Sequence, residues 1–226
     1  MFVQVSNLNK KYRDKEVLKN IKLLIEENKT YALLGANGAG KTTLLQILAG
    51  LIPSDSCEIK TKDTDRELFY YIPNKPNFLE YLSGRENLEM LSSLKGINKQ
   101  EVNDLIDKFD VSNFIDELFI TYSQGMAEQL SFLMGFLFNP HILLLDEPFS
   151  SLDILNSIKI KNKLKQYISG GNSTIISTHI MAVAHQLSDE VLLLNNGEII
   201  QFQNNFHDLQ EFEKVVLNFL KRPEQS

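Results

Sequence analysis

The chain has 226 residues, of which 43% are apolar, and a formal net charge of −6. This length can bury a sizeable core in one domain, with or without a subdomain, and the acidic balance argues against a protein that coats nucleic acid. No run of about 18 apolar residues is present, so no segment is expected to span a bilayer. The N-terminus lacks the apolar core of a signal peptide, and the lone Cys57 gives neither a disulfide framework nor a metal pair. The chain is expected to be cytoplasmic.

The first residues of the chain are expected to form strands. Residues 2–5 predict a short strand, and the polar residues 7–15 after them are expected to be a turn region that carries Tyr12. Apolar and polar side chains alternate over residues 17–27, which predicts a longer strand.

A glycine-rich loop follows, with the sequence of a phosphate-binding loop. Its residues are Gly35, Ala36, Asn37, Gly38, Ala39, Gly40, Lys41, Thr42 and Thr43. A glycine, four variable residues and Gly-Lys-Thr form the P-loop pattern. The context fits, because residues 31–34 predict a strand before the loop and residues 44–49 a helix after it. Glycines let successive N–H groups turn toward phosphate oxygens, and the helix N-terminus adds donors and positive potential.

The end of this loop indicates a nucleotide with Mg²⁺. Lys41 is expected to reach the β- and γ-phosphates, and the Thr42 hydroxyl is expected to ligate the metal. The alternative is a glycine-rich turn with an incidental Lys-Thr, which the flanking strand and helix argue against.

The middle of the chain changes from strands to helices. Residues 57–61 and 68–72 are predicted strands, but residues 85–94 and 100–109 have helical spacing with charged outer faces. The strongly apolar segment 123–138 predicts a buried helix. We therefore expect a helical insert in a strand-containing chain.

The last part of the chain alternates strands and helices. The expected strands are 142–145, 173–177, 191–194 and 198–202, and the expected helices are 153–168, 180–187 and 209–220. The last two strands flank Asn195-Asn196-Gly197, a strong hairpin signal. Strands alternating with helices around a P-loop predict an α/β core with a parallel sheet.

Two acids, Asp146 and Glu147, follow the apolar run 142–145, which is typical of a buried parallel strand. Ligands in open α/β sheets gather at the carboxyl ends of the strands. Asp146 is therefore positioned to support Mg²⁺, mainly through its water shell, and Glu147 to polarise the water that attacks the γ-phosphate. An Asp-Glu pair at a strand end is common by itself, so the assignment depends on the P-loop and strand context.

With these motifs in order, the sequence resembles the ATP-binding cassette (ABC) ATPases over nearly its whole length. The segment Tyr122-Ser123-Gln124-Gly125-Met126 lies where the family carries its signature motif, usually Leu-Ser-Gly-Gly-Gln. Phe149-Ser150-Ser151-Leu152-Asp153 matches the D-loop, and Ser177-Thr178-His179 matches the switch histidine. Tyr12 matches the aromatic residue that stacks on adenine, and Asn74 falls at the Q-loop.

The resemblance implies an α/β fold: a P-loop NTPase core with a mostly parallel sheet, an N-terminal antiparallel β subdomain and an α-helical insert. Residues 1–226 would form a single ABC ATPase domain. Residues 1–76 and 140–226 would be its catalytic core, and residues 77–139, approximately, a helical subdomain with the signature helix.

The resemblance also implies a head-to-tail dimer with two ATP molecules, each with Mg²⁺, at its interface. The implied catalytic residues are Glu147, His179, Lys41 and Asn74, and the implied metal ligands are Thr42, Asp146 and Asn74. The implied ATP contacts are Tyr12, the loop from Gly35 to Thr43, Ser123, Gln124, Gly125, Met126 and Asp153. The signature residues would come from the second subunit, so ATP binding would close the dimer and hydrolysis would release it.

Several of these residues have a structural alternative. Tyr12 could pack against its own turn instead of adenine, and Ser123 could be a helix N-cap, alone or in addition to its ATP contact. His141, His185 and His207 have no partners at metal-ligand spacing and are treated as ordinary residues.

The sequence departs from the family pattern in a few places. Asn74 stands where the family has glutamine and is one methylene shorter, so we expect a water-mediated contact and slower hydrolysis. Gln124 and Met126 replace a glycine and a glutamine, a form that resembles the subgroup serving small exporters and bacterial self-resistance systems. Gln129 stands where an arginine is usual.

The resemblance implies the ATP-hydrolysing subunit of a transporter that powers a separate membrane permease, with export favoured over import. The chain would be peripheral on the inner face of the cell membrane, as a homo- or heterodimer, without nucleic acid. Phe78, Leu79 and Tyr81, within residues 73–82, are the candidate dock for the permease, although they could instead be core residues of the insert. The alternatives are a soluble ABC ATPase that acts on ribosomes or DNA and a nucleotide-sensing regulator with slow turnover.

Overall fold

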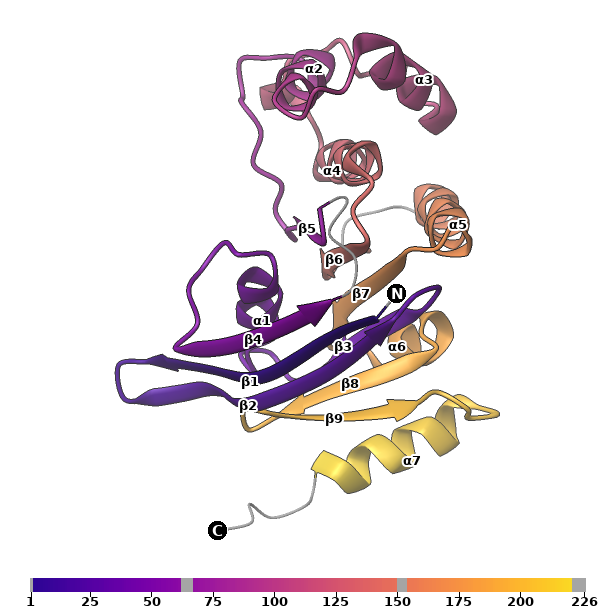
Figure 1. The fold of residues 1–226 in the computed structure, drawn as a ribbon. Helices are drawn as coiled ribbons and strands as arrows, with labels where there is room; N and C mark the ends of the chain where they lie inside the picture. The colour runs from indigo at the N-terminus through magenta and orange to yellow at the C-terminus, as the bar shows by residue number, and fades with distance from the viewer. Residues whose placement is uncertain (1, 62–66, 150–153, 221–226) are drawn as a thin grey trace.

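A computed structural model of the chain describes residues 2–61, 67–149 and 154–220. Within them, two β-sheets are layered with helices (Figure 1). The smaller sheet is antiparallel, with its strands in the order β2-β1-β4. These strands are β1 (Phe2–Tyr12), β2 (Lys15–Glu26) and β4 (Ser56–Thr61). They form the antiparallel N-terminal sheet that the family resemblance implies.

The larger sheet is mostly parallel, as expected, with its strands in the order β5-β6-β7-β3-β8-β9. The strands are β3 (Thr30–Leu34), β5 (Phe69–Ile72), β6 (Ile142–Asp146), β7 (Ser173–Thr178), β8 (Glu190–Asn195) and β9 (Glu198–Gln203). Only β9 runs antiparallel, paired with β8 through the predicted hairpin at Asn196 and Gly197. Every residue of β3, β6 and β7 is buried, because helices or the other sheet cover both faces of these central strands.

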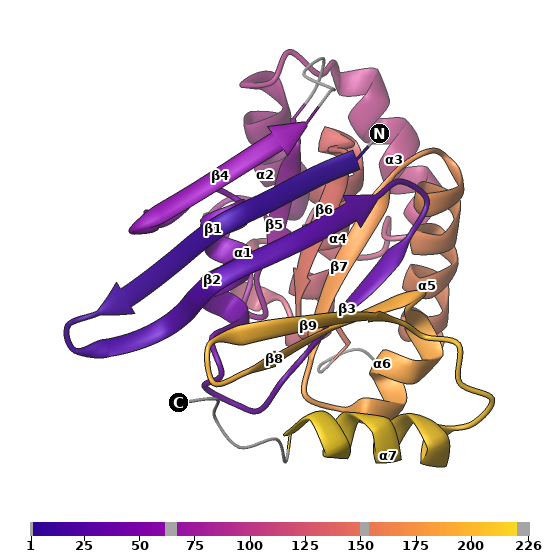
Figure 2. The same ribbon diagram turned by 60° about the horizontal axis from the view of Figure 1, so that its bottom comes forward.

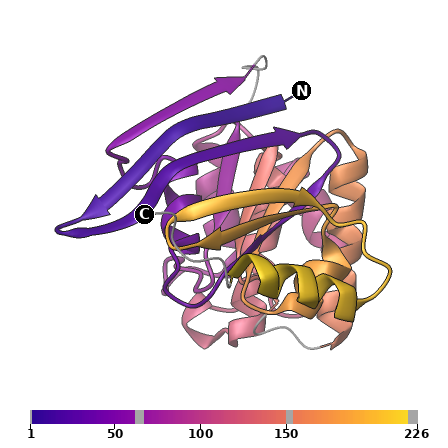
Figure 3. The ribbon, with the colours of Figure 1, turned by 90° about the horizontal axis from the view of Figure 1, so that it is seen from below.

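Three hydrophobic clusters hold the layers together. In the first, α1 (Lys41–Leu48) packs Leu44 and Leu45 between the two sheets, against residues such as Val5 and Leu192. In the second, α2 (Gly84–Ser93), α3 (Lys99–Phe109), α4 (Gln124–Phe138) and α5 (Ile154–Ser169) cover β5, β6 and β7. In the third, α6 (Met181–Leu187) and α7 (Leu209–Leu220) cover β3 and β8. Figures 2 and 3 show the antiparallel sheet running along one side of the molecule and α7 lying beside β8 and β9.

The helices begin where the sequence provides caps. The side chains of Ser83 and Asn98 each accept a hydrogen bond from the backbone N–H three residues later. The side chains of Glu86 and Glu101 in turn accept one from the backbone N–H of Ser83 and Asn98, so α2 and α3 both start with a capping box. A short 3₁₀ turn, η1 (Phe119–Thr121), leads into α4.

One prediction is wrong: residues 7–15 are not a turn region. Strand β1 continues to Tyr12, and only Arg13 and Asp14 form the turn. The reason is that β1 pairs on both sides, with β2 and with β4, while register shifts absorb the irregular segment. Leu8 is fully buried within this segment, so its polar neighbours do not remove it from the core.

The α2–α4 region lies together at one end of the molecule (Figure 1). Its buried residues, including Leu88 and Val102, share one cluster with Leu143 and Ile176 of the larger sheet. The boundary near residues 77 and 139 therefore has no separate core to mark it, and the division into a catalytic core and a helical subdomain stays a prediction.

Candidate functional site

The P-loop connects the buried strand β3 to α1, as the sequence predicts. Two of its glycines have no room for a side chain. A Cβ on Gly35 would lie 2.7 Å from the carbonyl oxygen of Leu194, and a Cβ on Gly40 would lie 2.9 Å from Cγ1 of Val17. Gly40 also has φ +109, which a residue with a side chain rarely adopts. The loop is thus fixed closely against β2 and β8.

Lys41 is buried, with 6% of its surface exposed. Its Nζ donates to the carbonyl oxygens of Gly35 (2.9 Å) and Ala36 (3.1 Å) and lies 3.9 Å from Oε1 of Glu147. Burial lowers the Lys41 pKa, and the charges of Glu147 and Asp146 oppose that shift. The ammonium is therefore held inside its own loop, next to the acid pair.

Asp146, at the end of β6, is the point on which three hydroxyl groups converge. Its Oδ2 accepts hydrogen bonds from Thr42 Oγ1 (2.7 Å) and from the Tyr71 hydroxyl (3.0 Å), and its Oδ1 accepts one from Ser177 Oγ (2.6 Å). Burial and the charge of Asp146 raise the Tyr71 pKa, so the phenol stays protonated and donates. The carboxylate is thereby oriented by three strands or helices at once.

Tyr71 and Ser177 were not identified from the sequence as site residues in their own right. The signal that could have found them is their place at the carboxyl ends of β5 and β7, the two strands that flank β6. Ser177 is even the direct pairing partner of Asp146 across β6 and β7.

Glu147 connects the acid pair to the predicted switch histidine. Its backbone is in the left-handed region, with φ 50, and its N–H donates to Ser177 Oγ at 3.0 Å. Its Oε1 lies 3.0 Å from Nδ1 of His179, which follows β7. The structure thus brings Lys41, Asp146, Glu147 and His179 together, as predicted.

A cleft of about 460 Å³ opens above these groups. Its lining residues are Tyr12, Val17, Asn37, Gly38, Gly40, Lys41, Thr42, Thr43, Asn74, Asp146 and Glu147. Tyr12 is 47% exposed at the edge of the cleft, and Lys10 Nζ lies 4.8 Å from its ring centroid. Asn74 lies in the same cleft as both acids, where the Q-loop was predicted.

The cleft also suits Mg²⁺, although no group of three or more His, Cys, Asp and Glu side chains at metal-binding distance occurs within the described residues. The Thr42 hydroxyl and the Asp146 carboxylate are oxygen donors that meet at 2.7 Å. Mg²⁺ takes few protein oxygens and keeps waters and nucleotide phosphates as its other ligands. These two residues therefore fit that ion without a larger cage.

The predicted signature residues lie elsewhere. Ser123 is the N-cap of α4 and accepts a hydrogen bond from the Met126 N–H at 3.2 Å, so the N-cap prediction is confirmed. Ser123 and Gln124 are exposed, Gly125 is half-buried, and none of the four signature residues lines the cleft. The predicted D-loop residue Asp153 lies outside the described residues.

In the portion of the chain that the structure covers, no helix is long and apolar enough to cross a bilayer.

Known proteins are similar to this chain in sequence and in fold. The model of the ABC transporter family matches residues 18–150, more than half of the chain. The chain is 33% identical to an uncharacterized ABC transporter ATP-binding protein, YxlF of Bacillus subtilis (strain 168), over 87% of this chain and 69% of that protein. It is 28% identical to the lantibiotic transport ATP-binding protein SrtF of Streptococcus pyogenes, over 96% of each chain.

Solved structures agree on the fold. An ATP-binding subunit of an ABC transporter superposes with a TM-score of 0.85 at 24% identity, over 96% of this chain and all of that one. A dimeric post-hydrolysis state of the cassette MJ0796 bound to ADP and Pi superposes with a TM-score of 0.80 at 22% identity, over 90% and 99%. The chain therefore belongs to the ABC transporter family, as one of its ATP-binding subunits, an ATPase.

Proposed function

We propose that this ATPase powers a separate membrane permease and that the transport it drives is export. The observation that carries the proposal is the division of the site: Lys41, Asp146 and Glu147 line one cleft and His179 contacts Glu147, while the signature residues lie apart at the start of α4. Export is supported by the similarity to SrtF, a lantibiotic transport ATP-binding protein that the chain matches over nearly its full length, and by the Tyr-Ser-x-Gly-Met signature.

We assign phosphate binding to the P-loop and to Lys41. The N–H groups of the loop and of the first turn of α1 present donors and positive potential to a nucleotide in the cleft. Lys41 then exchanges its bonds to the carbonyls of Gly35 and Ala36 for phosphate oxygens. Thr42 and Asp146 would hold Mg²⁺, which neutralises charge that develops on the phosphates.

Glu147 is assigned as the general base, because it is the carboxylate that faces the cleft beside Lys41 and His179. The Ser177 hydroxyl fixes its backbone and Asp146 together, so the two acids keep a constant separation. His179 holds the Glu147 carboxylate in place through Nδ1 and is assigned to the γ-phosphate through the rest of its ring.

In this proposal the γ-phosphate lies on the outward-facing side of the cleft. We assign Ser123, Gln124, Gly125 and Met126 of a second cassette to that side, since the exposed N-terminus of α4 offers a hydroxyl and N–H donors suited to an anion. Asp153 would lie at the same dimer interface. The complete site would therefore form only when two cassettes close head to tail, as a homo- or heterodimer.

Asn74 is assigned to a water-mediated contact with Mg²⁺ and the attacking water. It lines the cleft with both acids, but its side chain is one methylene shorter than the glutamine usual in the family. Replacement by glutamine should raise turnover and its stimulation by the permease. If Asn74→Gln leaves both unchanged, the assignment is wrong.

We propose the permease dock on an exposed apolar surface formed by Leu79, Tyr81, Leu118 and Ile120. Two backbone hydrogen bonds tie the two segments together, from Ile120 N–H to Glu80 O and from Phe119 N–H to Leu82 O. Leu118 and Ile120 were not predicted, because they come from a distant segment. Phe78 does not belong to this surface: it is half-buried, and its ring packs on Phe119 at 5.2 Å between centroids. For Phe78 the insert-core interpretation is correct.

Substitution tests this dock. Tyr81→Glu should abolish recovery of the permease while the isolated protein stays folded, since Tyr81 is 78% exposed. Leu94→Glu is the matched control, because Leu94 is equally exposed but lies at the end of α2, outside this surface. Equal permease recovery with both variants would remove the proposed dock.

The proposed motor is distinguished from the nucleotide-sensing regulator by Glu147→Gln. A motor should lose turnover and accumulate a closed dimer in ATP, measured by phosphate release and sedimentation velocity, whereas a sensor should change little.

Affinity purification from detergent-solubilised host membranes should recover a multi-spanning protein in fixed stoichiometry. Recovery of ribosomal or other soluble proteins alone would contradict both the transporter assignment and the proposed location at the inner face of the membrane.

A further inference from the structure

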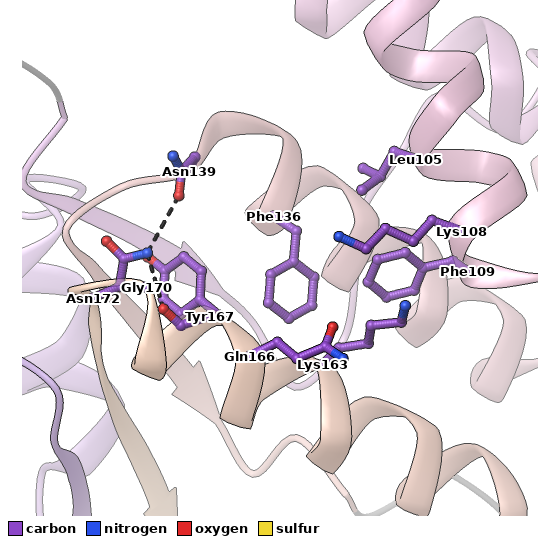
Figure 4. A pocket seen from close by; sticks show the side chains of 10 residues that line it. All are labelled: Leu105, Lys108, Phe109, Phe136, Asn139, Lys163, Gln166, Tyr167, Gly170 and Asn172. Atoms are coloured by element: carbon purple, nitrogen blue, oxygen red, sulfur yellow. Dashed lines mark hydrogen bonds between the residues drawn. The ribbon is translucent and has the colours of Figure 1, made fainter.

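A second cavity, of about 340 Å³, lies away from the nucleotide cleft, between α3, the end of α4 and α5 (Figure 4). Its lining residues are Leu105, Lys108, Phe109, Phe136, Asn139, Lys163, Gln166, Tyr167, Gly170 and Asn172. No residue is shared with the nucleotide cleft. Helix α4 has 15 residues, so this cavity lies about 22 Å along the helix from Ser123, at 1.5 Å per residue.

One part of the wall is aromatic. The ring centroids of Phe109 and Phe136 are 5.3 Å apart, and those of Phe136 and Tyr167 are 5.5 Å apart. The three rings come from three different helices and line one continuous surface (Figure 4). Such a wall favours a flat aromatic group, which can stack on one ring and meet the edge of the next.

Two lysines, Lys108 of α3 and Lys163 of α5, lie beside Phe109 in this wall (Figure 4). Neither ammonium forms an ion pair with a carboxylate of the described residues, whereas Lys159 on the same helix pairs with Asp110 at 3.0 Å. The Lys163 Nζ lies 5.2 Å from the centroid of Phe109. In Figure 4 the Lys108 side chain extends across Phe109 toward Phe136.

These two positive charges repel each other. Burial lowers the Lys163 pKa, and the charge of Lys108 lowers it further. An anion between them would relieve the repulsion and accept charge-assisted hydrogen bonds. The Gln166 side chain, which also lines the cavity, adds an amide donor.

We propose that this cavity binds a small planar aromatic anion, such as an aromatic carboxylate, with its ring on Phe136 and its charge between Lys108 and Lys163. The site would be separate from the ATP site, so both would be occupied at the same time. A ligand there would connect α3 to α5 and contact the end of α4 opposite the signature residues.

The test uses the intrinsic fluorescence of 2-naphthoate to measure its binding to the purified full chain. The neutral 2-naphthalenemethanol is the matched control ligand. We expect the acid to bind at least about tenfold more tightly than the alcohol, because charge-assisted hydrogen bonds exceed neutral ones. The double variant Lys108→Gln, Lys163→Gln should lose about the same factor. Lys159→Gln, whose lysine already has a partner, should bind as the unmodified protein does, and saturating ATP should not compete.

A second measurement does not depend on the variants. Acetylation of surface lysines in the unmodified protein, followed by mass spectrometry, should be reduced by 2-naphthoate at Lys108 and Lys163 and not at Lys159. Equal binding of acid and alcohol, full binding by the double variant, competition by ATP or unprotected lysines would each overturn the proposal.

Discussion

Asp146 receives hydrogen bonds from Thr42, Tyr71 and Ser177, but only the Ser177 hydroxyl also holds the neighbouring Glu147, through its N–H. We therefore expect Ser177→Ala to lower turnover about thirtyfold, because two hydrogen bonds worth about 1 kcal/mol each orient the acids. ATP affinity should change little, since Lys41 and the P-loop remain. Phosphate release and nucleotide titration measure the two effects separately.

The control for this variant is Thr174→Val on the same strand. The Thr174 hydroxyl donates to the Leu143 carbonyl at 3.0 Å in the core, far along β7 from Asp146. Thr174→Val should lower the stability of the fold without a selective effect on turnover. Unchanged turnover in Ser177→Ala would show that the serine is not required to position the acids.

Glu128 in α4 is the other residue with an unusual environment. Only 3% of its surface is exposed, and within the described structure both carboxylate oxygens are buried without a hydrogen-bond partner. Burial raises the Glu128 pKa from 4.5 to about 8. The folded protein then holds this proton more tightly than the unfolded chain, so the associated stability is complete below pH 4.5 and is lost as the pH rises through about 8.

Glu128→Gln tests this pH dependence, because glutamine is neutral at every pH. Urea unfolding should show the variant to be about 1–3 kcal/mol more stable than the unmodified protein at pH 8.5, with the difference vanishing below pH 4.5. Glu117→Gln, which changes an exposed carboxylate, should follow the unmodified protein. A constant difference at all pH values would mean that Glu128 does not titrate in this range.

For individual residues, the sequence was sufficient to predict the site residues that belong to contiguous motifs. It was insufficient for the site residues outside such motifs. Lys41, Thr42, Asp146, Glu147 and His179 meet as predicted, because their motifs follow adjacent strands of one parallel sheet. Tyr71 and Ser177 depend on the alignment of β5, β6 and β7, which local patterns do not determine. Their contacts to Asp146 had to come from the structure.

Among the elements, the start of α2 packs closely at Gly84 against Tyr122, which lies just before α4. A Cβ there would lie 2.0 Å from the Tyr122 hydroxyl and 3.0 Å from its Cζ. Tyr122 also donates to the Phe114 carbonyl at 3.0 Å and directly precedes the signature serine. The first turn of α2 therefore helps to place the start of α4.

Gly84→Ala should consequently destabilise the protein by about 1–3 kcal/mol, since overpacking outweighs the better helix propensity of alanine. It should also lower turnover, because Tyr122 must move. Urea unfolding and phosphate release check both effects, with Ser93→Ala at the exposed end of the same helix as the control. Unchanged stability would mean that Tyr122 shifts without cost.

The elements themselves were predictable where the pattern was regular. The capped helices and the buried parallel strands lie within a few residues of their predicted bounds. Strand β1 was not predicted beyond residue 5, because its bulged, polar second half is stabilised by pairing with β2 and β4 and not by its own sequence pattern. Turn-forming residues such as Asn7, with φ 51, lie here inside a strand.

On the scale of the whole molecule, the main structural fact is that the signature residues lie apart from the cleft. The P-loop lies between the sheets, and the signature residues cap α4 in the helical region (Figure 1). If two copies of this chain complete each other's sites, a defect in one half can be compensated by a copy with a defect in the other half.

A mixing experiment tests this directly. Lys41→Ala removes the phosphate-binding ammonium but leaves α4 intact, and Gly125→Glu blocks the signature but leaves the P-loop intact. Each variant alone should lose nearly all turnover. In an equal mixture, a dimer of one copy of each has one site with both defects and one site with none, so phosphate release should recover a substantial fraction of the unmodified rate.

Mixing Lys41→Ala with Glu147→Gln is the control, because both changes affect the same half and no dimer contains an intact site. Recovery in the first mixture alone would establish a composite site between copies of this chain. No recovery in either would show that the completing half belongs to a different cassette, and the dimer would then be a heterodimer.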